Sequence, residues 1–84
     1  MANSDPREPF FLIVADLDAG LFCVEGPMTD DQPWRRAVQH AKEKQSRHIS
    51  SGPTGPDRDA LAREFQQTHK FRGVPPGSIV RPRP

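Results

Sequence analysis

The longest uninterrupted apolar stretch of the chain, residues 10–15, constrains its fold more than any other feature. Six consecutive apolar residues are short for a helix but suit a strand that is buried on both faces. A turn-forming Asp/Gly segment follows, and residues 21–25 form a second strand-like run. The two runs predict a β-hairpin, with residues 10–15 as the central strand of the sheet.

A first helix is predicted after this hairpin. Thr29 and Gln32 have the spacing of a capping box, while Pro33 moves the expected start to residue 30 or 31, since proline is tolerated only in the first turn. The helix is expected to end near residue 44 or 45. Its apolar stripe consists of residues spaced i, i+3, i+4 and i+7, namely Trp34, Ala37, Val38 and Ala41.

The second half of the chain predicts one more helix and two weak strands. Residues 47–50 are a short strand candidate, and residues 51–55 form a loop by their Gly and Pro content. The helix is expected to begin at Pro56, which suits the first helical position, and to stop at Gly73. Residues 77–81 form a possible short last strand.

This order, β-β-α-β-α-(β), indicates a small single α+β domain with two helices packed on a three- or four-stranded mixed sheet. Residues 1–9 are expected to be disordered, residues 10–73 to form the domain, and residues 74–84 to be a Pro/Arg-rich tail. Trp34 and Phe65 are expected to be buried on the same side of the sheet. The other expected core residues are Phe11, Ile13, Leu21, Phe22, Val24, Val38, Ile49 and Leu61.

Composition argues against several functional classes. One cysteine allows no internal disulfide, and its apolar neighbours indicate that Cys23 is a core residue rather than a nucleophile. The three histidines, His40, His48 and His69, lack the spacing of metal ligands, so we expect no metal and no cofactor. The apolar run is too short to span a bilayer and no signal peptide precedes it, which indicates a soluble cytoplasmic protein.

No catalytic constellation is recognisable. Asp16 and Asp18 flank a turn, and the acidic residues near residue 30 suit a helix start, so each pair has a structural role. The G-x-S-x-G motif is absent. We therefore assign no catalytic residue; a pocket that joined Asp16 or Asp18 to Ser51 would favour a small enzyme.

Charge is divided unevenly along the chain. Residues 1–31 carry a net charge of −6 and residues 32–84 a net charge of +7. The basic half could meet an anionic partner, or the two halves could neutralise each other within the fold or across a dimer. A basic face is predicted in and after the first helix, where Arg36, His40 and Lys44 are four residues apart. Its candidate residues are Arg35, Arg36, Lys44 and Arg47.

The Gly/Pro segment of residues 50–57 is the best candidate anion site. A strand, a loop of small residues and a helix start would present free N–H groups to a phosphate. The candidate residues are Ser51, Gly52, Thr54 and Gly55. Pro53 and Pro56 each lack an N–H group, so a stiff connection without a ligand is the alternative.

Residues 51–60 also resemble the loop G-G-x-x-G-x-D-x-x-A of the SLOG-type nucleotide-binding families. Gly52, Gly55, Asp57 and Ala60 match this pattern, and Ser51 stands where the family prefers glycine. The resemblance implies a Rossmann-like fold that binds a nucleotide or a nucleotide-derived ligand.

Together these features favour a small non-enzymatic binding or regulatory protein that acts through a protein partner or self-association. The alternative is binding of an anion, a nucleotide or a nucleic acid, through residues 50–57 and the basic first helix.

Overall fold

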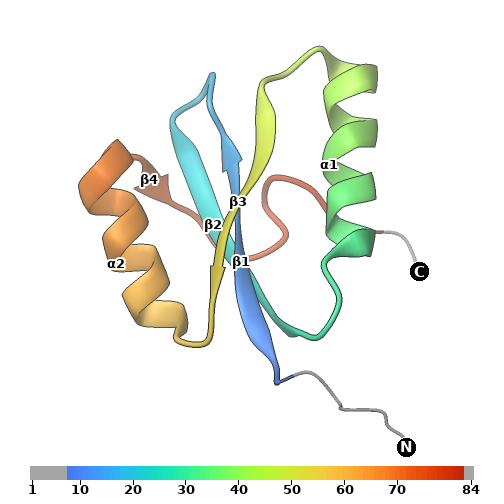
Figure 1. Cartoon of the computed structure of the whole chain (residues 1–84). Coiled ribbons are helices and arrows are strands. Elements are labelled where there is room, and N and C mark those ends of the chain that lie inside the picture. The colour runs from blue at the N-terminus through green and yellow to red at the C-terminus, as the bar shows by residue number, and fades with distance from the viewer. Residues whose placement is uncertain (1–7, 83–84) are drawn as a thin grey trace, which may run out of the picture.

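The computed structural model describes residues 8–82, and its elements follow the order β1-β2-α1-β3-α2-β4 (Figure 1). The strands are β1 (Phe10–Asp16), β2 (Leu21–Met28), β3 (Ile49–Gly55) and β4 (Arg72–Gly73), and the helices are α1 (Gln32–Gln45) and α2 (Arg58–His69). They form one sheet of order β3-β1-β2-β4. β1 is antiparallel to β2 and β3, and β4 is parallel to β2.

The predicted α+β class, the hairpin and the central place of residues 10–15 are confirmed by this sheet. Most of the segment expected to be disordered, residues 1–9, lies outside the described residues, as do residues 83–84 of the expected tail.

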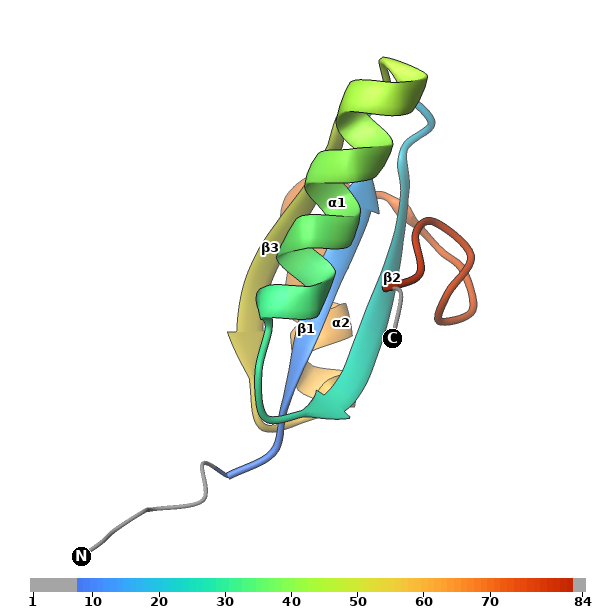
Figure 2. The same cartoon turned by 90° about the vertical axis from the view of Figure 1, so that its right-hand side faces the viewer.

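The two helices cover opposite faces of the sheet (Figures 1 and 2). Side chains alternate along β1, so Leu12 and Val14 pack with α1, whereas Ile13 and Ala15 pack with α2. The prediction that Trp34 and Phe65 lie on one side of the sheet is wrong, because they join different cores. A strand that is apolar at every position needs cover on both faces.

Most of the predicted core is buried. Phe11, Leu21 and Trp34 are only half-buried, and the other predicted core residues are buried. Six further buried residues were not among these predicted core positions: Ala15, which packs with α2, and five in the core beneath α1, namely Leu12, Val14, Cys23, Ala41 and Val80.

The helix ends follow local backbone chemistry. Asp31 precedes α1 and Pro33 lies in its first turn, as expected for the later of the two predicted starts. α2 begins two residues after Pro56, because Asp57 is the N-cap and its carboxylate accepts hydrogen bonds from two backbone N–H groups. α2 ends at His69, followed by the C-cap residue Lys70 with a φ of 56°, and so stops before the predicted Gly73.

Residues 51–55 belong to β3, so the loop predicted there is wrong. They pair with β1 on one side, and β3 is an edge strand, where Pro53 is tolerated because its missing N–H faces no ladder partner. A shift in register lies beside this proline, between Leu12 and Val14 of β1.

The C-terminal part of the domain differs from its prediction as well. Residues 77–81 form no strand; the last described strand is instead β4. After β4 the chain crosses to the α1 face, where Val74, Ile79 and Val80 join the core beneath α1. We call residues 74–82 the C-terminal strap. A helix about 10 Å wide covers roughly two strands spaced about 4.8 Å apart, so the strap covers the part of this face that α1 leaves open (Figure 2).

Candidate functional site

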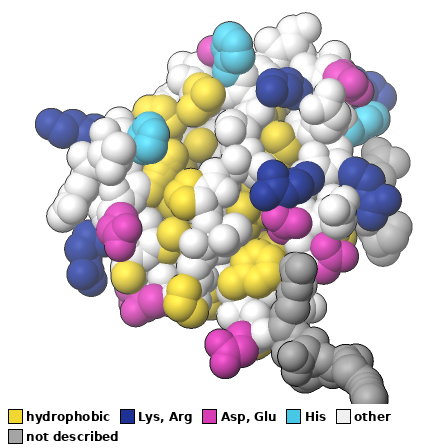
Figure 3. Space-filling view, in the orientation of Figure 1, with side chains coloured by type: hydrophobic (Ala, Val, Ile, Leu, Met, Phe, Trp, Pro, Cys, Tyr) yellow, Lys and Arg dark blue, Asp and Glu magenta, His cyan; other side chains and the backbone are white. Residues whose placement is uncertain are grey.

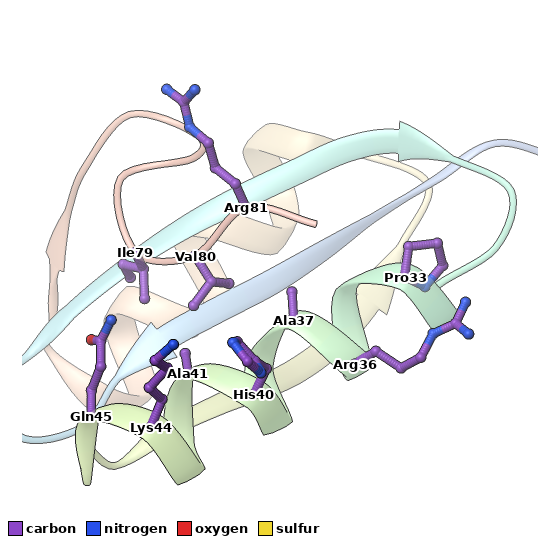
Figure 4. A pocket seen from close by; sticks show the side chains of 10 residues that line it. All are labelled: Pro33, Arg36, Ala37, His40, Ala41, Lys44, Gln45, Ile79, Val80 and Arg81. Carbon is purple, nitrogen blue, oxygen red and sulfur yellow. The ribbon is translucent and has the colours of Figure 1, made fainter. Parts of the chain in front are cut away.

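A groove of about 790 Å³ lies between α1 and the C-terminal strap (Figure 4). Its apolar lining comes from α1 and from the strap, which contribute Ala37, Ala41, Ile79 and Val80. Pro33 lies at one end of the groove and Gln45 at the other. The volume is within the range of about 300–1,000 Å³ that is typical of ligand sites.

Every ionisable side chain among the lining residues is a base: Arg36, His40, Lys44 and Arg81. His40 and Lys44 project from α1 toward the strap, Arg36 extends toward the Pro33 end, and Arg81 points away from α1 (Figure 4). Within residues 8–82, Arg36, Lys44 and Arg81 form no ion pair. The groove therefore combines an apolar lining with uncompensated positive charge.

A buried carboxylate anchors the strap to the sheet. Glu25, on β2, is only 4% exposed. One of its oxygens accepts a hydrogen bond of 2.6 Å from the N–H of Gly77 and another of 3.0 Å from the thiol of Cys23. Gly77 has a φ of +81°, a conformation that strongly favours glycine. Glu25 and Gly77 thus position the wall of the groove to which Ile79 and Val80 belong.

The same contacts suppress the acidity of Cys23. The pKa of its thiol is raised to about 12. Burial is the main cause and the neighbouring Glu25 carboxylate the second, while the N–H groups of Gly77 and Ile79 oppose the rise. Cys23 is 1% exposed, so it is a core residue, as predicted, and has no character of a nucleophile.

We expect Cys23 to resist alkylation in the folded protein. With a pKa of about 12, only about one thiol in ten thousand is ionised at pH 8, and the strap covers it. Iodoacetamide should react slowly with the native protein. In about 8 M urea, which unfolds small domains, it should alkylate one thiol per chain rapidly. Rapid native reaction would show that the strap opens readily.

The four predicted basic-face residues divide into two pairs. Arg36 and Lys44 line the groove. Arg35 instead pairs with Asp31 at 2.7 Å, and Arg47 pairs with the buried Asp16 at 2.6 Å. Figure 3 shows acidic and basic side chains interspersed on this face, with hydrophobic and uncharged areas between them. The two halves of the chain neutralise each other at these pairs, but not in the groove.

Asp16 and Asp18 join the hairpin turn to the start of β3. Asp18 accepts hydrogen bonds from the backbone N–H of His48 and lies 3.0 Å from its Nδ1; the side-chain hydrogen bond to His48 is the main cause that lowers the pKa of Asp18. For Asp16, burial acts to raise the pKa, but hydrogen bonds from the Ala19 N–H and from Arg47 outweigh it and lower the pKa. These carboxylates have structural partners.

In the segment predicted to bind an anion, residues 50–57, the glycines and nearby N–H groups contact other parts of the protein. Gly52 and Gly55 face the protein's own core, because a Cβ there would lie 3.5 Å from Ile13 and Leu61 respectively. Two N–H groups in the first turn of α2, those of Asp59 and Ala60, donate to the Asp57 carboxylate. Ser51 lies in the ladder with β1, and its hydroxyl is 3.5 Å from Arg35. Ser51, Gly52, Thr54 and Gly55 stay a prediction as binding residues, and none of them lines the groove.

A second cavity of about 320 Å³ lies between α2 and the segment after β4, lined by Phe22, Arg58 and Val74 among others. Neither this cavity nor the groove is lined by Asp16, Asp18 or Ser51, the arrangement that would favour an enzyme.

Among residues 8–82 there is no group of three or more His, Cys, Asp or Glu side chains that could hold a metal ion. Over the same residues, neither helix has the length and apolar character needed to cross a bilayer.

Comparison of the chain with protein-family models, with curated proteins and with solved structures finds no match. The nucleotide site that the SLOG resemblance implies stays a prediction. The Rossmann-like sheet that it also implies is not observed, because such a sheet is mostly parallel and β1 here is antiparallel to both of its neighbours.

Sequence reasoning placed Arg36, His40 and Lys44 on one helical face, although it named only Arg36 and Lys44 as candidate residues. It missed the wall of the groove that the strap forms. Ile79 and Val80 had a signal too, as an apolar pair inside a tail of prolines and arginines. Their packing beside α1 depends on a crossing of the sheet edge that no local pattern reveals.

Proposed function

We propose that this protein is a non-enzymatic binding protein that holds an anionic group of its ligand in the groove between α1 and the C-terminal strap. One observation carries the proposal: among residues 8–82, the ionisable residues that line the groove are Arg36, His40, Lys44 and Arg81, without a carboxylate. Lysine and arginine form charge-assisted hydrogen bonds with carboxylates and phosphates alike, so the shared chemistry is an anionic oxygen group.

The apolar lining strengthens this role. Ala37, Ala41, Ile79 and Val80 keep water from one side of a bound ligand, and charges attract each other more strongly where the surroundings are less polar. A cytoplasmic location, in keeping with a lone and unpaired cysteine, is part of the proposal.

Reversing the charge of Lys44 is expected to weaken binding of an anionic probe roughly fivefold to tenfold. The change removes an attraction of about 0.5–0.7 kcal/mol and adds a repulsion of similar size. The measurement is an NMR titration of the isotope-labelled protein with poly-L-glutamate and, separately, with inorganic triphosphate. Amide shifts should centre on residues 33–45 and 79–81.

Lys42→Glu is the matched control, because Lys42 is an exposed residue of the same helix that does not line the groove. It makes the same change in net charge and should lower the affinity much less than Lys44→Glu. Equal losses in the two variants would mean that the probes respond to net charge alone. Shifts confined to residues 50–57 would transfer the site to the predicted Gly/Pro segment.

A further inference from the structure

We propose that the occupant of the groove is an extended, acidic segment of a partner polypeptide, with acidic residues at every second position. This inference rests on the proposed function and names the ligand class for the same groove. It follows from the composition of the lining, from the length of the groove and from the spacing of its basic residues.

The composition of the lining favours a polypeptide over a nucleic acid. Proteins that bind single-stranded nucleic acids combine basic residues with aromatic side chains on which the bases stack. In the described part of the chain, no Phe, Tyr or Trp lines the groove; its apolar lining consists of Ala37, Ala41, Ile79 and Val80 with Pro33 at one end. Small aliphatic side chains suit the aliphatic side chains of a peptide.

The length of the groove suits a short extended segment. Pro33 and Gln45, at its two ends, are twelve residues apart on α1, which corresponds to about 18 Å at about 1.5 Å per residue. An extended chain advances about 3.3 Å per residue, so five or six residues fill this distance.

The basic row on α1 has a spacing that an extended chain can match. Arg36, His40 and Lys44 follow one another at four-residue intervals, a rise of about 6 Å each. In an extended chain, side chains on the same face recur about every 6.6 Å. Acidic residues at alternate positions would therefore each meet one basic residue of α1, while the residues between them face the strap with Ile79 and Val80 (Figure 4).

The test compares two peptides of one composition in fluorescence anisotropy with the full chain: acetyl-Glu-Val-Glu-Val-Glu-amide and acetyl-Glu-Glu-Glu-Val-Val-amide, each with the same dye. We expect the alternating peptide to bind at least fivefold more tightly. Lys44→Glu should reduce its affinity about tenfold, and Lys42→Glu should leave it within twofold of the wild type.

The outcomes separate this inference from the function on which it rests. Equal affinity for the two peptides, with the loss in Lys44→Glu retained, overturns the alternating pattern and leaves anion binding in the groove. Tighter binding of oligothymidylate or ATP than of either peptide, again sensitive to Lys44→Glu, overturns the polypeptide partner alone. If no anionic probe binds, or if Lys44→Glu has no effect on any of them, both proposals fail.

Discussion

Replacing Glu25 with alanine is expected to detach the C-terminal strap and to abolish ligand binding in the groove. The Glu25 carboxylate is buried and accepts the hydrogen bonds of the Gly77 N–H and the Cys23 thiol. Alanine leaves both donors without a partner, and an unsatisfied buried N–H costs about 1–3 kcal/mol. We expect a loss of about 2 kcal/mol in unfolding free energy and at least tenfold faster hydrogen exchange at residues 77–80.

The Glu25→Gln variant is the matched control. Its amide oxygen can still accept the Gly77 hydrogen bond, so the strap should stay seated and the affinity for poly-L-glutamate should change less than threefold, a difference of about 0.6 kcal/mol. A third readout is the alkylation rate of Cys23, which should rise in Glu25→Ala only. If the strap amides of Glu25→Ala exchange as slowly as those of the wild type, then Ile79 and Val80 hold the strap without the carboxylate.

Replacing Asp16 with alanine is expected to lower the unfolding free energy by about 2–3 kcal/mol at pH 7. The change removes the buried carboxylate that accepts hydrogen bonds from Arg47 and from the N–H groups of Asp18 and Ala19. A domain of this length has a total stability of about 4–12 kcal/mol, so the effect is large. Urea unfolding followed by the fluorescence of Trp34 measures it, with Asp59→Asn, at an exposed carboxylate, as the control.

The pH dependence of this effect has a definite sign. The pKa of Asp16 is lower in the folded protein than its ordinary value of 3.8, because hydrogen bonds outweigh the opposing effect of burial. The ionised form therefore stabilises the fold above that ordinary value, and the contribution is lost as the pH falls through the lowered pKa. The difference between wild type and Asp16→Ala should shrink below about pH 4. A difference that stays constant down to about pH 2 would mean that the carboxylate is not the stabilising group.

The local elements of the fold could be predicted from the sequence, and their arrangement only in part. The run of residues 10–15 identified the central strand because continuous burial requires continuous apolar character. The start of α1 was predictable because Pro33 and the preceding aspartates leave few positions for it. The apolar stripe of a helix, however, does not tell which face of a sheet it covers.

Backbone pairing explains the remaining errors. Residues 51–55 have the composition of a loop, but pairing with β1 makes them an edge strand. The two residues of β4 carry no pattern of their own and become a strand through hydrogen bonds with β2. Half of the predicted basic face was lost to ion pairs: Arg35 pairs with Asp31 one helical turn earlier, and Arg47 pairs with Asp16, which only the fold brings near.

The route of the strap across the edge of the sheet sets the order in which the two walls of the groove can form during translation. Domains fold as the chain emerges from its N-terminal end, so the hairpin, α1 and β3 are synthesised well before Ile79 and Val80. A nascent chain that has reached β4 contains both helices and all four strands of residues 8–82 but only one wall of the groove. The α1 wall of the groove is therefore synthesised about thirty residues before the strap wall that completes it.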